Sequence, residues 1–154
     1  MTLTAGGAEL LEQVAPLWLE LRSHHASLDP VWRDGLLAAT FETRKAGLLA
    51  KSEGGQLFVL LARSSDRAAN VIAYCVCTVT AAGDGEVDSL FVAASHRRRG
   101  IGDALMSRAM AWLAGRATQS LAVEVMACNA DALRLYERYG FRPRTVRMLH
   151  VRGA

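Results

Sequence analysis

The sequence predicts a protein of the α/β class, and within it of the α+β type, with a helical first third followed by strands interleaved with helices. Apolar residues recur at three- and four-residue spacing as far as about residue 50, which indicates amphipathic helices. Runs rich in β-branched residues begin after Gly54 and Gly55, which indicates strands. The chain has 154 residues, enough to bury one core, so we expect a single domain over residues 1–154.

Two helices are expected in the first third of the chain. The first runs from Ala8 to His24, although Pro16 would weaken it. The second runs from Arg33 to Ala50 and stops at Gly54-Gly55. Their apolar stripes are Leu10, Leu11, Val14, Leu17, Trp18 and Leu21 in the first helix, and Leu36, Leu37, Thr40, Phe41 and Leu48 in the second. These helices would form one side of the domain.

Strands and helices then follow in turn. Gln56 to Ala62 and Val71 to Thr80 are predicted to form an antiparallel hairpin around the polar turn Arg63 to Asn70. The elements after residue 92 are a helix from about Gly100 to Ala114, a strand from Leu121 to Ala127, a helix from Asn129 to Tyr139 and an extended segment from Phe141 to Val151. In its part from Arg144 to Val151, Val146, Met148 and His150 alternate with Arg147 and Leu149, so this part could pair as an edge strand with a second subunit and give a homodimer.

A further strand is expected at Glu86 to Val92. Strict alternation would place Val87 and Phe91 on one face. The other face would carry Glu86, Asp88, Leu90 and Val92. One face of this strand should therefore present carboxylates.

Composition and charge favour a globular protein with an anionic ligand. Apolar residues make up 51% and charged residues 21% of the chain, and the net charge is +3 with a pI near 9.0. Three arginines cluster at Arg97 to Arg99, which suits an anion without requiring a nucleic-acid surface. The start resembles no secretory signal and no apolar run could span a membrane, so a cytoplasmic location is expected. Cys75, Cys77 and Cys128 lack metal-ligand spacing, so we expect buried thiols and no metal.

The run Arg97-Arg98-Arg99-Gly100-Ile101-Gly102-Asp103 lies between an expected strand and an expected helix. A helix N-terminus exposes unpaired N–H groups, and glycines let the backbone approach a ligand closely. Arginines add charge-assisted hydrogen bonds to phosphate oxygens. The spacing matches neither the Rossmann fingerprint nor the P-loop. A pyrophosphate group is the ligand this loop suits.

Two motifs together resemble the GCN5-related N-acetyltransferase (GNAT) superfamily. Arg97 to Gly102 is similar to its acyl-CoA loop, Gln/Arg-x-x-Gly-x-Gly/Ala. Asn129-x-x-Ala132-x-x-Leu135-Tyr136-Glu137-x-x-Gly140-Phe141 is similar to its C-terminal signature, with a spacing also found in ribosomal-protein alanine N-acetyltransferases. The sequence departs from the pattern at Ala94, where proline is frequent, and at Arg98, where glycine is common. The resemblance implies a mixed, largely antiparallel central sheet with helices on both faces.

The resemblance also implies acetyl transfer from acetyl-CoA, as co-substrate, to an amine. The implied cofactor-binding residues are Leu90, Phe91 and Val92 for the pantetheine arm and acetyl carbonyl, Arg97, Arg98, Arg99, Gly100, Ile101, Gly102 and Asp103 for the pyrophosphate, and Asn129 and Tyr136 beside the arm. Asn129 could also, or instead, cap the following helix. The same loop on a non-catalytic acyl-CoA sensor is the alternative function.

Tyr136 matches the residue that the family uses as general acid. A phenol with a reference pKa of about 10 is protonated at neutral pH, so it can donate to a thiolate. Tyr139, three residues on, is its natural control, since a buried aromatic is the alternative interpretation of Tyr136.

The general base is left open among carboxylates. Glu124 lies five residues before Asn129, where ribosomal-protein alanine N-acetyltransferases place a catalytic glutamate, and burial between Val123 and Val125 would raise its pKa. Asp88 and Glu86 could instead hold a water molecule or the acceptor's ammonium group. A solvated carboxylate is the alternative interpretation for each of the three.

Other polar and aromatic residues are given structural interpretations. His24 and His25 have no third ligand at a matching spacing and are interpreted as a solvated helix end. Trp18, Trp32 and Phe41 are expected in the core rather than in an acceptor pocket. The acceptor itself stays open among protein N-termini, lysine, polyamines, aminoglycosides and small amines, and neither nucleic acid nor membrane is expected as a partner.

Overall fold

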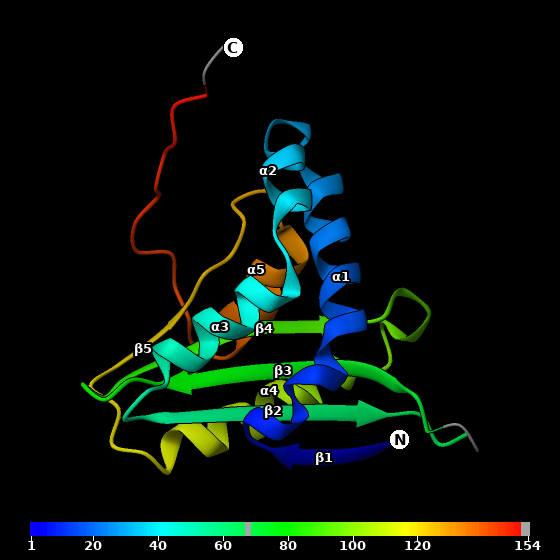
Figure 1. Cartoon of the computed structure of the whole chain (residues 1–154), viewed down its shortest axis with the longest axis vertical. Coiled ribbons are helices and arrows are strands. Elements are labelled where there is room, and N and C mark those ends of the chain that lie inside the picture. Colours follow the sequence, from blue (N-terminus) through cyan, green and yellow to red (C-terminus); the bar gives the residue numbers. More distant parts are fainter. Residues whose placement is uncertain (67–68, 152–154) are drawn as a thin grey trace.

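The computed structural model describes residues 1–66 and 69–151 and is built on one five-stranded sheet (Figure 1). The strands are β1 (Thr2–Gly6), β2 (Gln56–Arg63), β3 (Val71–Val79), β4 (Asp84–Val92) and β5 (Ser120–Val123), in that spatial order. Neighbouring strands are antiparallel except for β4 and β5, which are parallel. The predicted mixed, largely antiparallel sheet is confirmed. Residues 67 and 68 of the predicted turn lie outside the described residues.

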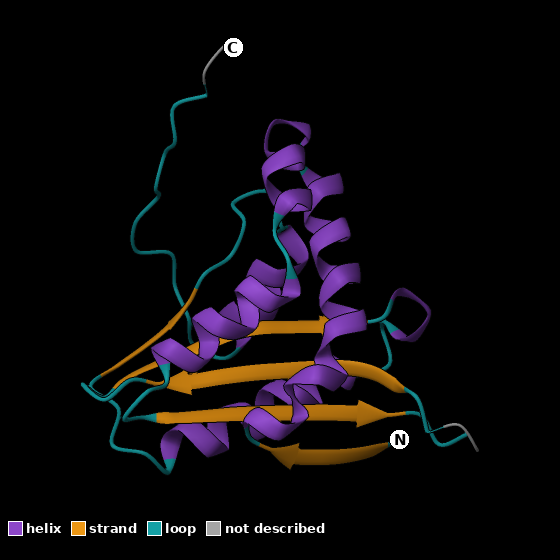
Figure 2. Cartoon of the chain, in the orientation of Figure 1, coloured by secondary structure: helices purple, strands orange, loops and turns teal. Residues whose placement is uncertain are grey.

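Helices cover both faces of this sheet (Figures 1 and 2). The α-helices are α1 (Leu11–Leu28), α2 (Arg33–Ala38), α3 (Phe41–Lys51), α4 (Ile101–Ala114) and α5 (Ala130–Arg138), and short 3-10 turns occupy Ala8–Leu10, Pro30–Trp32 and Ala94–His96. In Figure 1, α1 and α3 lie in front of the sheet and α4 lies behind it. Among the described helices, none has the length and apolar character needed to cross a bilayer.

The alternation of β3 divides the core into two clusters. Tyr74 and Val76 pack with the α1 and α3 side chains, whereas Cys75 and Cys77 pack with those of α4. All four are fully buried, because this strand is central in the sheet and covered on both faces. Trp18 and Phe41 pack against each other in the α1 cluster with tilted rings whose centroids are 5.8 Å apart, which confirms them as core. Trp32 is only half-buried.

A β-bulge in β4 makes the predicted alternation of that strand wrong. Val76 pairs with Ser89 but Cys77 pairs with Val87, so Asp88 is an extra residue opposite β3. The extra residue reverses the faces that follow it: Val87 packs on the α4 side, whereas Phe91 packs on the α1 side. Leu90 and Val92 therefore face α4 and not the face that carries Asp88.

Further differences from the predictions have local causes. The second predicted helix is two helices, because the hydroxyl of Thr40 accepts the Thr43 N–H (3.2 Å) and caps a new helix there. The strand β1 was missed, since it is a five-residue edge strand without an apolar run. The predicted last strand is wrong: residues 141–151 form no strand, and Met148 is 90% exposed. Cys128 is exposed, unlike Cys75 and Cys77.

Candidate active site

A cavity of about 840 Å³ lies where β4 and β5 separate. Their pairing ends at Val87 and Val123, and beyond this point the segments 88–92 and 124–126 become walls of the cavity. The edge of β4 that faces β5 therefore loses its partner strand there, and its backbone groups need other partners. An extended ligand with amide groups can supply them.

Most of the predicted cofactor residues line this one cavity. They are Leu90, Phe91, Val92, Arg97, Arg98, Gly100, Ile101, Gly102, Asp103, Asn129 and Tyr136. Arg99 is the exception in the loop, since it is exposed and does not line the cavity. The residues are spread from Leu90 to Tyr136 in the sequence, so the fold brings the two motifs together.

The loop before α4 presents backbone donors to the cavity. Gly100 is the N-cap of α4, and no side chain caps the first turn. It has a φ of +73°, and a Cβ built there would meet nothing within 4 Å, so open space lies beside the backbone. Arg98 has a φ of +59°, in the left-handed region where glycine is preferred, which explains why a glycine suits this position. The first N–H groups of α4 are thus free for an anion.

Arg97 is held in place by the strand it follows. Its Nε donates to the Val92 carbonyl oxygen at 3.0 Å, and its guanidinium lies over the Phe91 ring at 5.3 Å. The acidic group of the same loop, Asp103, is neutralised by an ion pair with Arg138 at 2.7 Å. The mouth of the cavity at α4 is therefore positively charged, as an anionic ligand requires.

Tyr136 and Tyr139 have different surroundings, although they are three residues apart on or next to α5. Tyr136 lines the cavity, is 7% exposed and makes no hydrogen bond through its hydroxyl to any described residue. Burial raises the pKa of Tyr136, so the phenol stays protonated at neutral pH. The Tyr139 hydroxyl instead donates to the Asp103 carbonyl oxygen (2.9 Å) and lies 3.1 Å from Ser107 Oγ.

Asn129 caps α5, as the alternative interpretation anticipated. Its Oδ1 accepts the Ala132 N–H at 3.2 Å. Since the residue also lines the cavity, its amide nitrogen remains as a donor toward a ligand. The cap and the cavity position coexist.

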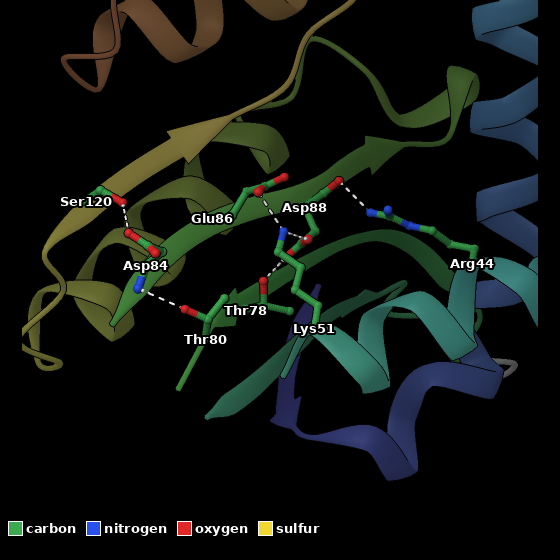
Figure 3. A network of polar contacts seen from close by, with 8 residues as sticks. All are labelled: Arg44, Lys51, Thr78, Thr80, Asp84, Glu86, Asp88 and Ser120. Carbon is green, nitrogen blue, oxygen red and sulfur yellow. Dashed lines mark hydrogen bonds and ion pairs between the residues drawn. The ribbon is translucent and has the colours of Figure 1, made fainter. Parts of the chain in front are cut away.

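The carboxylates of β4 are engaged in a network with α3 and β3 (Figure 3). Asp88 is 1% exposed at its side chain, and its two carboxylate oxygens accept from Lys51 Nζ (2.7 Å) and Thr78 Oγ1 (2.7 Å). Lys51 also pairs with Glu86 at 2.6 Å. Burial alone would lower the pKa of Lys51, but the bonds and charges of the two carboxylates raise it. Asp88 borders the cavity, and both of its carboxylate oxygens already accept hydrogen bonds within this network.

Glu124 lies in the cavity wall just after β5, but it is exposed. The expectation that Val123 and Val125 would bury it is wrong, because β5 ends at Val123 and the chain leaves the sheet. No described residue forms an ion pair with Glu124, so its carboxylate faces solvent and the cavity.

His24 and His25, interpreted from the sequence as a solvated helix end, also line the cavity. Both are half-buried, and neither ring makes a hydrogen bond to a described residue. Burial lowers the pKa of His24, as does the charge of Arg97, while Asp131 opposes them. Burial and the neighbouring His24 lower the pKa of His25. Both rings are therefore neutral near pH 7. In the sequence, only their position near the end of α1 could have indicated that they lie at the cavity.

Within residues 1–66 and 69–151, no group of three or more His, Cys, Asp or Glu side chains could hold a metal ion.

Comparison with known proteins agrees with this geometry. The model of the acetyltransferase (GNAT) family matches residues 17–141, most of the chain. The chain belongs to the GNAT family. Both motifs of this GNAT protein lie inside the matched region. No curated protein matches the chain.

Solved structures similar to this GNAT protein share its fold at low sequence identity. A mutant of the BH1408 protein from Bacillus halodurans has a TM-score of 0.71 at 18% identity, with 97% of this chain and 98% of that chain covered. A ribosomal-protein-alanine N-acetyltransferase from Brucella melitensis has a TM-score of 0.59 at 18% identity, covering 96% and 100%. An aminoglycoside N-acetyltransferase in complex with CoA has a TM-score of 0.63 at 14% identity, covering 99% of both chains.

Proposed function

We propose that this GNAT protein is a one-domain N-acetyltransferase that moves an acetyl group from acetyl-CoA directly to a primary amine. The observation that carries the proposal is the single cavity that holds the free α4 N-terminus, the unpaired edge of β4 and Tyr136. Acetyl transfer from acetyl-CoA needs an anion site for the pyrophosphate, a strand edge that can bond to the amides of the pantetheine arm, and a proton donor for the leaving thiolate. No cysteine lines the cavity among the described residues, which favours direct transfer over an acyl-cysteine intermediate.

Different residues of the cavity act on different parts of acetyl-CoA. Residues 97–103, apart from Arg99, hold the pyrophosphate, and Asn129 and residues 90–92 bind the pantetheine arm and orient the thioester carbonyl. The amine nitrogen forms a bond to the carbonyl carbon and the carbon–sulfur bond breaks. Tyr136 donates its proton to the departing thiolate, so that CoA leaves as the thiol. The acylated nitrogen releases one proton to solvent, and the phenolate regains one from solvent, so the products are the neutral amide and the CoA thiol.

The acceptor must lose a proton before it attacks, because an alkylammonium has a reference pKa of about 10.4. We assign proton acceptance to Glu124, directly or through water, rather than to Asp88, whose carboxylate is bonded to Lys51 and Thr78. His24 and His25 are additional neutral acceptors in the same cavity. The acceptor classes that the similar structures' names suggest are a protein N-terminal alanine and an aminoglycoside amine.

Two measurements test the function. Acetyl-CoA at one hundred times its Kd should stabilise the fold by about 2.7 kcal/mol, which raises the Tm by about 5–11 °C for a chain of this size. CoA thiol release is then followed over a panel of protein N-termini, lysine, polyamines, aminoglycosides and small amines. Release with at least one amine is expected. A Tm shift with no release from any amine would instead favour the acyl-CoA sensor, and the absence of both would refute acyl-CoA binding.

A further inference from the structure

We propose that α3 is the positioning element of the active site, acting through Lys51 and Arg44 on the bulge at Asp88. Both side chains come from α3 and both reach the same residue of β4 (Figure 3). Lys51 Nζ donates to the Asp88 carboxylate at 2.7 Å, and Arg44 Nη2 donates to the Asp88 carbonyl oxygen at 2.8 Å. The inference rests on the proposed acetyl transfer, because it assigns the geometry of the residues that would bind the thioester.

The bulge decides which backbone groups of β4 face the cavity. Because Asp88 is the extra residue, Leu90 turns to the α4 side and Phe91 to the α1 side. If the bulge moved or closed, each later residue of the strand would shift by one position and exchange faces. Residues 90–92 are those expected to orient the acetyl carbonyl, so the bulge and the chemistry are linked.

The network holds the bulge through several contacts from two elements. Thr78 of β3 donates to the second carboxylate oxygen of Asp88, at 2.7 Å, and is itself fully buried. Lys51 also pairs with Glu86, two residues earlier on β4, at 2.6 Å. Leu48 and Phe41 anchor α3 in the core. Both the side chain and the backbone carbonyl of Asp88 therefore accept hydrogen bonds. An ion pair on the protein surface would involve the side chain alone.

The geometry separates this effect from cofactor binding. The pyrophosphate loop, residues 97–103, lies beyond the end of β4, and none of its residues bonds to Arg44, Lys51 or Asp88. Loss of the network should therefore misplace the thioester carbonyl while most of the binding energy for CoA is kept. A displacement of about 1 Å at a reacting group can cost about a hundredfold in rate.

The test compares Lys51→Met with Lys51→Arg and with the matched control Lys45→Met. Lys45 is on the same helix and also forms an ion pair, but with Glu12 of α1 rather than with a residue of β4. We expect Lys51→Met to lower kcat about tenfold to a hundredfold with the Kd for CoA within about twofold. Lys51→Arg should restore part of kcat, and Lys45→Met should leave both constants unchanged. An unchanged kcat in folded Lys51→Met, or a Kd that rises in step with the loss of kcat, overturns the proposal.

A second variant guards against loss of folding, since Lys51→Met leaves the buried Asp88 charge without its cation. In the background of Asp88→Asn, which removes that charge, adding Lys51→Met should lower kcat much less than in the wild type. If Lys51→Met lowers kcat by the same factor in the wild type and in the Asp88→Asn background, the proposal is overturned. If the wild type releases no CoA with any amine, the proposed function fails; the positioning role is then read from amide hydrogen exchange. Exchange at Ser89 and Leu90 should be faster in Lys51→Met than in Lys45→Met, and equal rates refute it.

Discussion

Replacing Tyr136 by phenylalanine should separate chemistry from stability, because its hydroxyl has no hydrogen-bond partner among the described residues. The ring keeps its edge-on contact with Phe141, with centroids 5.9 Å apart, so packing is preserved. No bond is lost, and we expect the free energy of unfolding to stay within about 0.5 kcal/mol of the wild type. If Tyr136 protonates the leaving thiolate, kcat should fall about 10²–10⁴-fold.

Tyr139→Phe is the matched control, with the opposite expected result. Its hydroxyl donates to the Asp103 carbonyl oxygen and lies within hydrogen-bond distance of Ser107. A net hydrogen bond contributes about 1 kcal/mol, so the Tm should fall by about 2–4 °C. Because Tyr139 does not line the cavity, kcat should change much less than in Tyr136→Phe.

The assay is CoA thiol release with the best acceptor of the panel, alongside thermal unfolding and CoA titration of both variants. The reasoning requires Tyr136→Phe to lose turnover and to retain both its Tm and its Kd for CoA. Unchanged turnover would refute the general-acid assignment. A loss of Tm equal to that of Tyr139→Phe would show that the hydroxyl has a structural partner instead.

Three further predictions concern the rest of the cavity. Gly100→Ala should lower the free energy of unfolding by about 1–2 kcal/mol in thermal unfolding, because Gly100 has a φ of +73°. The same variant should raise the Kd for CoA at least about tenfold in calorimetry, because the added Cβ would project into the space beside the loop. Glu124→Gln should lower kcat with acceptor amines and leave CoA binding unchanged; equal kcat values would assign the base elsewhere. For His25, the pKa in the folded state is below the unfolded value of about 6.5. The unfolded state therefore binds more protons, and stability is lost as the pH falls below the unfolded pKa. His25→Gln should therefore reduce the drop in Tm between about pH 7 and about pH 5.5, whereas the exposed His150→Gln should not.

The sequence predicted those parts of the fold that depend on local pattern. The hairpin of β2 and β3 and the helix after the arginine run follow from periodicity and from glycines at their ends, and they were found within a few residues of the prediction. The missed break at Thr40 depends on one side-chain bond to the Thr43 N–H, which competes with the helix. The last segment was predicted as a strand because Val146, Met148 and His150 alternate with Arg147 and Leu149, but alternation makes no strand without a neighbour to pair with.

The cofactor side of the site was predictable for a related reason. In the proposed function, the loop and the Asn129 to Phe141 motif would each bind the cofactor through backbone groups or through residues fixed by a helix, so their spacing in the sequence carries their geometry. The acceptor side carries no such signal. His24 and His25 reach the cavity only because the end of α1 lies beside β4, a contact between segments more than 60 residues apart.

Asp88 shows why residue type and strand position could not identify the base. A carboxylate within a strand suggests a proton acceptor in a cleft, and Asp88 does border the cavity. Whether it can accept a proton depends on Lys51, 37 positions earlier, and on Thr78 of the next strand, and both bond to it. The same contacts suit Asp88 to the positioning role proposed above, since they fix the bulge that turns Leu90 toward the α4 side. A buried carboxylate whose two oxygens already accept hydrogen bonds is well suited to hold a backbone in place.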